Sequence, residues 1–252
     1  MPRSRLYRTQ AVILKRMDLG EADRIVTFFT RDMGKIRAVA KGVRRTTSRS
    51  AGHLEPFTLS DILFAAGREL DVVSQADTLE SFRGVREDLV LTTHAYYLAE
   101  VVDLLTEDRL ENRAVFEALV EGMRELGQHD DARLVLVIFH LRLLDGLGYR
   151  PELRECVVCR STIQPDKNQF SAILGGAVCP ACGPREPSAR ELSVPALKLL
   201  RFLQQTDGRR AVSVPPHVSR EAEALLRDYA ERIIERRLRS PALIARVQEA
   251  GR

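Results

Sequence analysis

The stretch that decides the fold of the first part of the chain covers residues 23–45 and reads DRIVTFFTRDMGKIRAVAKGVRR. Residues 23–30 and the run from Gly34 onward both have the composition of strands, and the turn-forming sequence DMGK lies between them. Side chains of a strand alternate between its two faces. The stretch therefore predicts two antiparallel strands joined by a tight turn, in which Gly34 takes a positive φ.

The second of these strands predicts a cationic surface. Its apolar and basic side chains fall on opposite faces, with Ile36, Ala38 and Ala40 on one and Lys35, Arg37 and Lys41 on the other. Arg44 and Arg45 follow at once. This alternation predicts a strand that buries a small apolar stripe and displays a row of cations.

Further strand-like runs at residues 7–17, 57–64 and 69–77 bring the number of predicted strands to five. Five short strands joined by turns are typical of a small closed barrel, and we expect one of the OB type. A Ser- and Thr-rich segment after Val43 predicts a long loop. We expect Phe28, Phe29 and Phe57 to be structural, since several of the few aromatics must fill the barrel core.

From Asp88 onward the apolar period is helical. Helices are expected at residues 113–126, 130–149, 193–205 and 219–240, with Ser193 as an N-cap. The predicted fold class is α+β multidomain: an OB-type β-barrel, then a helical bundle with an inserted four-cysteine zinc module. The predicted boundaries are 1–80 for the barrel, 81–150 and 187–252 for the two parts of the helical domain, and 151–186 for the zinc module.

All four cysteines lie in two C-x-x-C pairs: Cys156, Cys159, Cys179 and Cys182. Two residues between thiolates allow one tight turn to supply two sulfurs to a tetrahedral ion, and the 19 residues between the pairs suit a short hairpin. The spacing predicts one structural zinc ion with no open coordination position. A dithiol redox pair and an iron–sulfur cluster remain as alternatives.

The charge is unevenly distributed. Residues 1–50 hold 13 Lys and Arg against 4 Asp and Glu, residues 51–182 hold 12 against 22, and residues 183–252 hold 14 against 9. A basic first segment indicates a polyanionic partner, since clustered cations release the counterions of nucleic acid. A solvated basic surface is the alternative.

Signatures of catalysis are lacking in the sequence: it has no phosphate-binding glycine loop, nucleophile elbow or HExxH motif. The five histidines are scattered, and we expect each to be structural or exposed. We therefore predict no enzyme. No apolar run is long enough to span a bilayer, so a cytoplasmic, nucleoid-associated protein without membrane contact is expected.

Three stretches together resemble the bacterial RecO family of recombination mediators: LGEADRIVTFFTRDMGKIRAVAKGVRR with SRSAGHLEPF, then FHLRLLDGLGYRPELREC, then the paired C-x-x-C motifs. The resemblance runs over nearly the whole chain in the same order. It implies DNA repair and recombination: binding of single- and double-stranded DNA and annealing of complementary strands. It also implies cooperation with RecR in loading RecA onto DNA coated with single-stranded DNA-binding protein (SSB), with RecF as a further partner.

OB barrels hold a nucleic-acid backbone in a basic groove, so the barrel cations are the predicted DNA-binding residues. They are Lys35, Arg37, Lys41, Arg44, Arg45 and Arg49, joined by Arg16 and Arg24 from neighbouring strands. The acidic C-terminal tail of SSB needs cations beside an apolar groove, and the candidates are Arg142, Arg201, Arg209 and Arg210. We expect contact mainly with phosphates and little sequence preference.

Two other classes of function remain open. One is a nucleic-acid-modifying enzyme with an OB domain and a zinc knuckle, and a DNA cleavage assay would detect it. The other is a zinc-containing scaffold protein whose basic face is only a solvated surface.

Overall fold

The computed structural model describes residues 6–129, 131–208 and 213–250. It divides into two compact units, one of residues 1–128 with 239–252 and one of residues 129–238. This division follows packing and is coarser than the four segments predicted from the sequence, whose boundaries remain a prediction. Within the described residues, no helix is both long and apolar enough to cross a bilayer.

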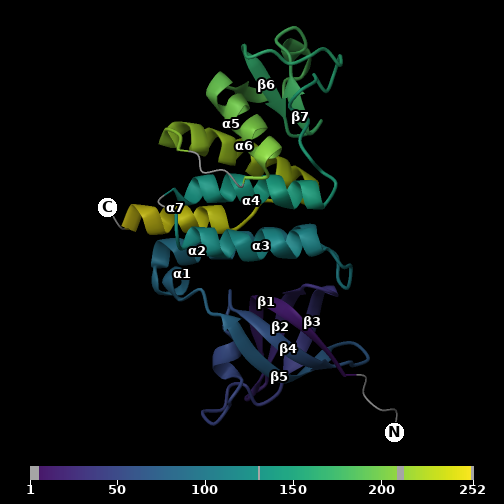
Figure 1. Cartoon of the computed structure of the whole chain (residues 1–252), viewed down its shortest axis with the longest axis vertical. Helices are drawn as coiled ribbons and strands as arrows, with labels where there is room; N and C mark the ends of the chain where they lie inside the picture. Colours follow the sequence, from purple (N-terminus) through teal and green to yellow (C-terminus); the bar gives the residue numbers. More distant parts are fainter. Residues whose placement is uncertain (1–5, 130, 209–212, 251–252) are drawn as a thin grey trace. The chain divides into compact units, whose positions relative to one another are not determined.

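The first unit begins with a closed five-stranded barrel (Figure 1). Its strands are β1 (Leu6–Leu19), β2 (Asp23–Thr30), β3 (Gly34–Ala40), β4 (Leu59–Ala65) and β5 (Asp71–Glu80). The order around the barrel is β1-β2-β3-β5-β4, with β3 and β5 parallel and the other pairs antiparallel. A single 3-10 turn, Ala51–Leu54, precedes β4. The predicted OB-type barrel is confirmed.

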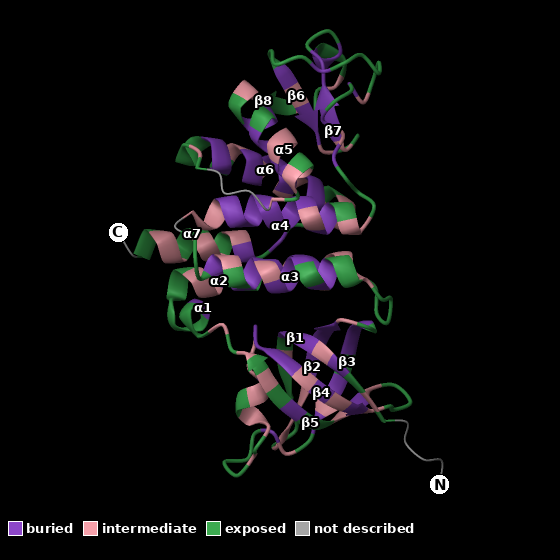
Figure 2. Cartoon of the chain, viewed as in Figure 1, coloured by how far each residue is buried: buried purple, intermediate pink, exposed green. Residues whose placement is uncertain are grey.

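The barrel closes around the apolar faces of its strands, which are buried in Figure 2. Phe28 meets Phe64 edge to face at a centroid distance of 5.2 Å, and Ile36 is buried in the same cluster. Phe29 and Phe57 are also buried, so the structural role expected for the three phenylalanines is confirmed. Each large apolar side chain buried in this way contributes about 1.5–3 kcal/mol.

Four helices of the described chain complete the first unit: α1 (Arg83–Glu87), α2 (Leu89–Leu105), α3 (Arg113–Leu126) and α7 (Ser240–Ala250). Asp88 and Asn112 cap α2 and α3 by accepting hydrogen bonds from the backbone N–H groups of Leu91 and Val115. Helix α2 packs against both α3 and α7. The Glu100 carboxylate of α2 accepts hydrogen bonds from the backbone N–H groups of Arg239 and Ser240, so it caps the start of α7.

One helix prediction is wrong at its end. The sequence predicts a continuous helix over 219–240, but α6 (Pro216–Ile234) stops because Glu235 takes a left-handed conformation at φ 59°. The backbone N–H of Leu238 then donates to the Glu231 carboxylate, and α7 begins separately at Ser240. The charged sequence ERRLR contains no glycine or proline that would have signalled this break.

The second unit packs α4 (Ala132–Gly146) against α5 (Val194–Thr206) and α6. Helix α4 is buried on most sides (Figure 2), and Asp131 caps it through the N–H groups of Arg133 and Leu134. His140 on α4 is fully buried, and this burial lowers its pKa to about 4. Its Nδ1–H donates to the Leu136 carbonyl at 2.9 Å, which confirms its structural role.

The cysteine segment carries a three-stranded sheet in the order β7-β6-β8. The strands are β6 (Asn168–Ser171), β7 (Gly176–Val178) and β8 (Arg190–Leu192), with a 3-10 turn at Gly183–Arg185. Phe170, Ala177 and Leu192 of these strands belong to the same apolar cluster as helices α4, α5 and α6. The cysteine module is therefore joined to its helices by a shared core.

In the first unit, the side chain of Lys35 is enclosed and only 11% exposed. Its Nζ donates to the backbone carbonyls of Asp103 at 2.6 Å and Thr106 at 2.8 Å, at the end of α2. The Asp103 and Asp108 carboxylates lie 3.7 and 3.6 Å from the same nitrogen. The prediction that strand β3 displays the Lys35 cation is therefore wrong, because the chain after α2 covers it.

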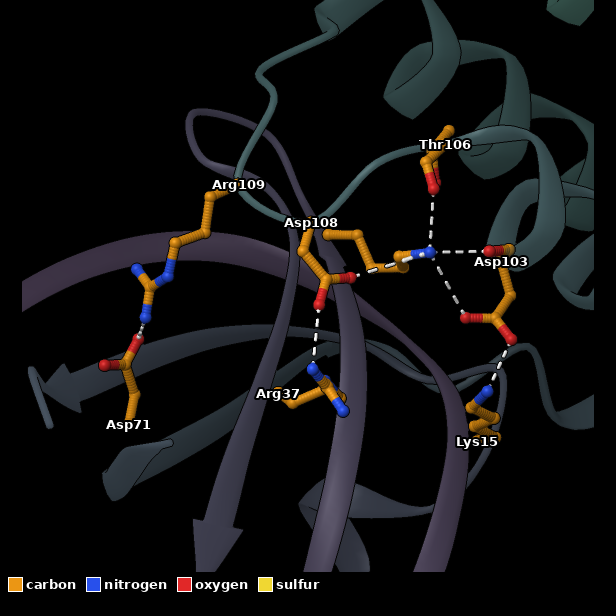
Figure 3. A network of polar contacts seen from close by, with 8 residues as sticks. Lys15, Arg37, Asp71, Asp103, Thr106, Asp108 and Arg109 are labelled. Carbon is orange, nitrogen blue, oxygen red and sulfur yellow. Dashed lines mark hydrogen bonds and ion pairs between the residues drawn. The ribbon is translucent and has the colours of Figure 1, made fainter. Parts of the chain in front are cut away.

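The chain after α2 is held against β3. The Arg109 N–H donates to the Lys35 carbonyl at 2.8 Å. A Cβ on Gly34 would lie 2.0 Å from the Leu110 carbonyl oxygen, so only glycine allows this approach. Its φ of 64° confirms the predicted turn. Arg109 also pairs with the buried Asp71 of β5 at 2.8 Å, as Figure 3 shows.

Replacing Lys35 by methionine should lower the free energy of unfolding of the full-length protein by about 2 kcal/mol. The substitution keeps most of the side-chain volume but leaves the Asp103 and Thr106 carbonyls without their donor. Urea denaturation followed by circular dichroism measures the change. The matched control is Lys41→Met on an exposed lysine, which should stay within about 0.5 kcal/mol of the wild type. Equal midpoints for the two variants would contradict a structural role of Lys35.

Candidate nucleic-acid interface and metal centre

The basic segment that follows β3 is fixed to the hairpin of β1 and β2. The Asp23 carboxylate accepts a hydrogen bond from the Gly42 N–H at 2.7 Å. The Arg44 N–H donates to the Ala22 carbonyl at 2.9 Å. Gly42 has a φ of 64°, which turns the chain at the end of the strand. The segment after Ala40 therefore has a defined place on the barrel beside the β1–β2 turn.

Three predicted DNA-binding residues have exposed side chains: Lys41, Arg45 and Arg49. Among the residues that the structure describes, none of the three forms an ion pair or a side-chain hydrogen bond. Their cations are free to meet an anion from solution. They form the part of the predicted basic surface that is most available for phosphate contact.

Arg44 of this segment and Arg24 of β2 share one acidic partner. Arg24 Nε lies 2.9 Å from one Asp18 oxygen and Arg44 Nη2 lies 3.5 Å from the other. Arg44 Nη1 also donates to the Gly20 carbonyl at 2.9 Å. The hydrogen bond from Arg24, followed by the charge of Arg44, lowers the pKa of Asp18. The Asp18 carboxylate is therefore shared by two cations and neutralises only one of their charges.

The remaining predicted barrel cations interact with carboxylates or carbonyl groups of the protein. Arg16 is paired with Glu55. Arg37 Nη2 lies 3.0 Å from the Asp108 carboxylate. Lys35 is enclosed by oxygens at the end of α2. The structure thus gathers Lys41, Arg44, Arg45, Arg49 and Arg24 in and beside one turn region and separates Lys35 from them.

Sequence reasoning missed the acidic residues that neutralise barrel cations. Asp103 Oδ2 forms an ion pair with Lys15, and Asp108 pairs with Arg37 (Figure 3). Both acids follow the barrel in the sequence and lie in or after α2. The acidic run EDRLE at residues 107–111 is visible in the sequence, but nothing in that run indicates which strand it contacts.

The four predicted metal ligands come together in one cluster. Their sulfur atoms all lie within 4.8 Å of one another, and the Cys159 and Cys179 Sγ atoms are 3.7 Å apart. Four sulfurs at 2.3 Å from a central zinc ion would be separated by about 3.8 Å in a tetrahedron. The donor set and spacing therefore fit a tetrahedral thiolate site.

Tight turns shape each half of the cluster. The Arg160 N–H donates to the Cys156 carbonyl at 2.9 Å, and the Gly183 N–H donates to the Cys179 carbonyl at 3.0 Å. The Cys179 N–H also points at the Cys156 sulfur, at 3.4 Å. A thiolate accepts such hydrogen bonds better than a thiol does. The backbone thus favours the form of cysteine that binds a metal.

The thiols differ in acidity because they have different hydrogen-bond partners. Hydrogen bonds from Ser161 lower the pKa of Cys159 to about 6. The hydrogen bond with Cys159 is the main cause that raises the pKa of Cys182 to about 12. An ion that binds all four as thiolates must displace protons, so metal binding at this site is coupled to pH.

The arginines predicted to meet the SSB tail have internal partners where they are described. Arg201 donates to the Leu153 carbonyl at 2.9 and 2.6 Å and to the Ile163 carbonyl at 2.8 Å, on both sides of the first cysteine pair. Arg142 Nε donates to the Asp207 carbonyl at 2.9 Å. Arg209 and Arg210 lie outside the described residues. Arg201 therefore supports the cysteine module from α5.

Two family models together match most of the chain. The family model described as Recombination protein O N terminal matches residues 3–82, and the model described as Recombination protein O C terminal matches residues 86–242. A protein named DNA repair protein RecO from Roseiflexus sp. (strain RS-1) is 42% identical over 251 residues, which cover 98% of this chain and 88% of the relative.

Two further relatives with the same name come from other bacteria. The protein of Symbiobacterium thermophilum is 35% identical over 250 residues, covering 97% of this chain and 99% of the relative. The protein of Shouchella clausii is 31% identical over 248 residues, covering 98% and 96%. Since both family models and near full-length relatives agree with the barrel and the helical units, the chain belongs to the RecO family of DNA repair proteins.

Proposed function

We propose that this protein is a non-catalytic recombination mediator that binds single- and double-stranded DNA and anneals complementary strands. The observation that carries the proposal is the set of exposed, unpaired cations on the segment after β3, Lys41, Arg45 and Arg49, in a member of a DNA repair family. Arg24 and Arg44 extend this surface toward the β1–β2 turn. Arg16 and Arg37, each paired with a carboxylate, are proposed as further contacts. Lys35 is left out of the proposed interface, because its ammonium has a structural role.

The proposed contacts are made to phosphates. Arginine and lysine neutralise backbone charge without reading base edges, so we expect little sequence preference. The barrel aromatics Phe28, Phe29 and Phe57 are buried and are not available to stack bases. Cations that screen the repulsion between two strands while the bases stay exposed would allow the strands to pair. This combination suits annealing.

The proposed partners follow from the family. With RecR, the protein would help load RecA onto DNA coated with SSB, whose acidic tail it would bind, and RecF would be a further partner. We assign no residue to the SSB tail, because Arg142 and Arg201 are engaged within their own unit. The cysteine cluster would hold one zinc ion. Four thiolates complete a tetrahedral shell, so the ion would support structure and leave no position for substrate.

Reversing two of the free cations, with Arg45→Glu and Arg49→Glu together, should weaken DNA binding by at least tenfold at 0.1 M salt and slow annealing. Fluorescence anisotropy with a labelled oligothymidine measures affinity, and duplex formation between SSB-coated complementary strands measures annealing. Loss of two phosphate contacts should make the log–log salt slope shallower by about 1.4. The matched control, Lys198→Glu with Arg220→Glu, makes the same charge change on exposed positions of α5 and α6. Equal losses in both double variants would reject the barrel interface.

Purified protein should contain one zinc ion per chain by elemental analysis, and Cys182→Ala should remove it. The variant should melt at a lower temperature, since the metal supplies part of the folding free energy of the module, while DNA affinity stays within about twofold. Ser161→Ala is the control, because Ser161 contacts the Cys159 sulfur but supplies no thiolate, and it should keep the ion. Visible absorbance from bound iron would instead favour the iron–sulfur alternative.

A further inference from the structure

The segment after α2 places the Asp108 carboxylate close to two cations of the barrel, Arg37 and Lys35. The Arg109 N–H donates to the Lys35 carbonyl, and Lys35 and Asp108 form a parallel bridge between the backbones. Because the backbone is fixed here, Asp108 cannot move far from β3. Its carboxylate projects beside the outward face of the strand, where Figure 3 shows it against Arg37.

One Asp108 carboxylate meets two barrel cations. Its Oδ2 lies 3.0 Å from Arg37 Nη2, and its Oδ1 lies 3.6 Å from Lys35 Nζ. Arg37 is 56% exposed and Asp108 is 46% exposed, so solvent reaches the pair. A phosphodiester group also presents two anionic oxygens to a guanidinium, with similar geometry. The carboxylate therefore stands where a backbone phosphate would make the same contact.

The geometry points to Asp108 as an internal competitor for DNA: in the free protein it occupies the phosphate position on Arg37, and it is displaced there when a strand binds. This inference rests on the proposed function, of which it describes the regulation. Arg37 changes partner from carboxylate to phosphate. Lys35 does not, because carbonyls of Asp103 and Thr106 hold its ammonium.

The consequence is a limit on affinity at one contact. An exposed ion pair is weak, so a phosphate can replace the carboxylate on Arg37. Breaking the Arg37–Asp108 pair costs free energy, and this cost reduces the binding free energy gained from the phosphate contact. A strand held in this way leaves the surface more readily than one bound to an unopposed arginine. Annealing benefits, since a paired duplex must be released for another strand to enter.

Asp108→Asn tests the competition by removing the charge while keeping the size and a hydrogen-bond acceptor. It should bind an oligothymidine about two- to fivefold tighter than wild type, as expected for loss of an exposed ion pair. Its log–log salt slope should stay close to the wild-type slope, because Arg37 neutralises a phosphate in both complexes. The rate of duplex release, measured by competition, should fall by the same factor as the dissociation constant.

Asp77→Asn is the matched control. Asp77 pairs with Arg8 at 3.0 Å, is exposed, and lies on β5, so its replacement makes the same charge change at a pair that involves no residue of the proposed interface. A second variant, Asp108→Asn with Arg37→Ala, should lose the gain in affinity. Thermal melting verifies that each variant is folded.

The outcomes separate this inference from the proposed function. If Asp108→Asn binds DNA no tighter than Asp77→Asn does, or keeps its gain without Arg37, Asp108 is not a competitor, although the wild type still binds DNA. If the wild type fails to bind oligothymidine at low ionic strength, the proposed function fails, and the inference fails with it.

Discussion

The ammonium of Lys35, surrounded by oxygen atoms at the end of α2, is the contact on which the arrangement of the first unit depends. A buried cation without partners would be strongly unfavourable, so the two carbonyls and two carboxylates around it must stay in place. They hold the chain after α2 against β3. That same placement brings Asp108 to Arg37 and Arg109 to Asp71. The enclosure of Lys35 thus accompanies the compensation of Arg37 by Asp108.

The cations of the barrel fall into two groups according to whether they have a partner within the unit. Lys35 and Arg16 have partners within the unit, and the region around Lys41, Arg45 and Arg49 remains positive. Membership of a DNA repair family supports the proposal that this remaining charge meets the phosphates of a nucleic acid. In the second unit, the cysteine cluster shares a core with its helices and receives Arg201 from α5. The basic surface therefore lies on the barrel of the first unit, and the cysteine cluster lies on the helices of the second.

The parts of the fold with a strong local signal were predictable. Alternating residues fixed the strands β1 to β5, and the turn chemistry at Gly34 was correct. Cysteine spacing also predicted the thiolate cluster. The break at Glu235 was missed, since the sequence ERRLR at residues 235–239 contains no glycine or proline. Pro241, at the start of the separate helix α7, was a signal that the prediction did not use. The role of Lys35 was missed for a different reason. Alternation tells which side of a strand a residue takes, but only the later course of the chain decides whether that side is covered.

Helix α7 belongs to the first unit although it is encoded at the other end of the sequence. The Glu100 carboxylate that receives its first N–H groups is made some 140 residues earlier, as the sequence separation between Glu100 and Ser240 shows. During translation, the second unit emerges between these two segments, at a bacterial rate of roughly 5–20 residues per second. The two segments of the first unit are thus separated in synthesis by the whole second unit. A nascent chain interrupted before Ser240 would expose the side of α2 that α7 covers, so the packing of the first unit depends on a helix made after the whole second unit.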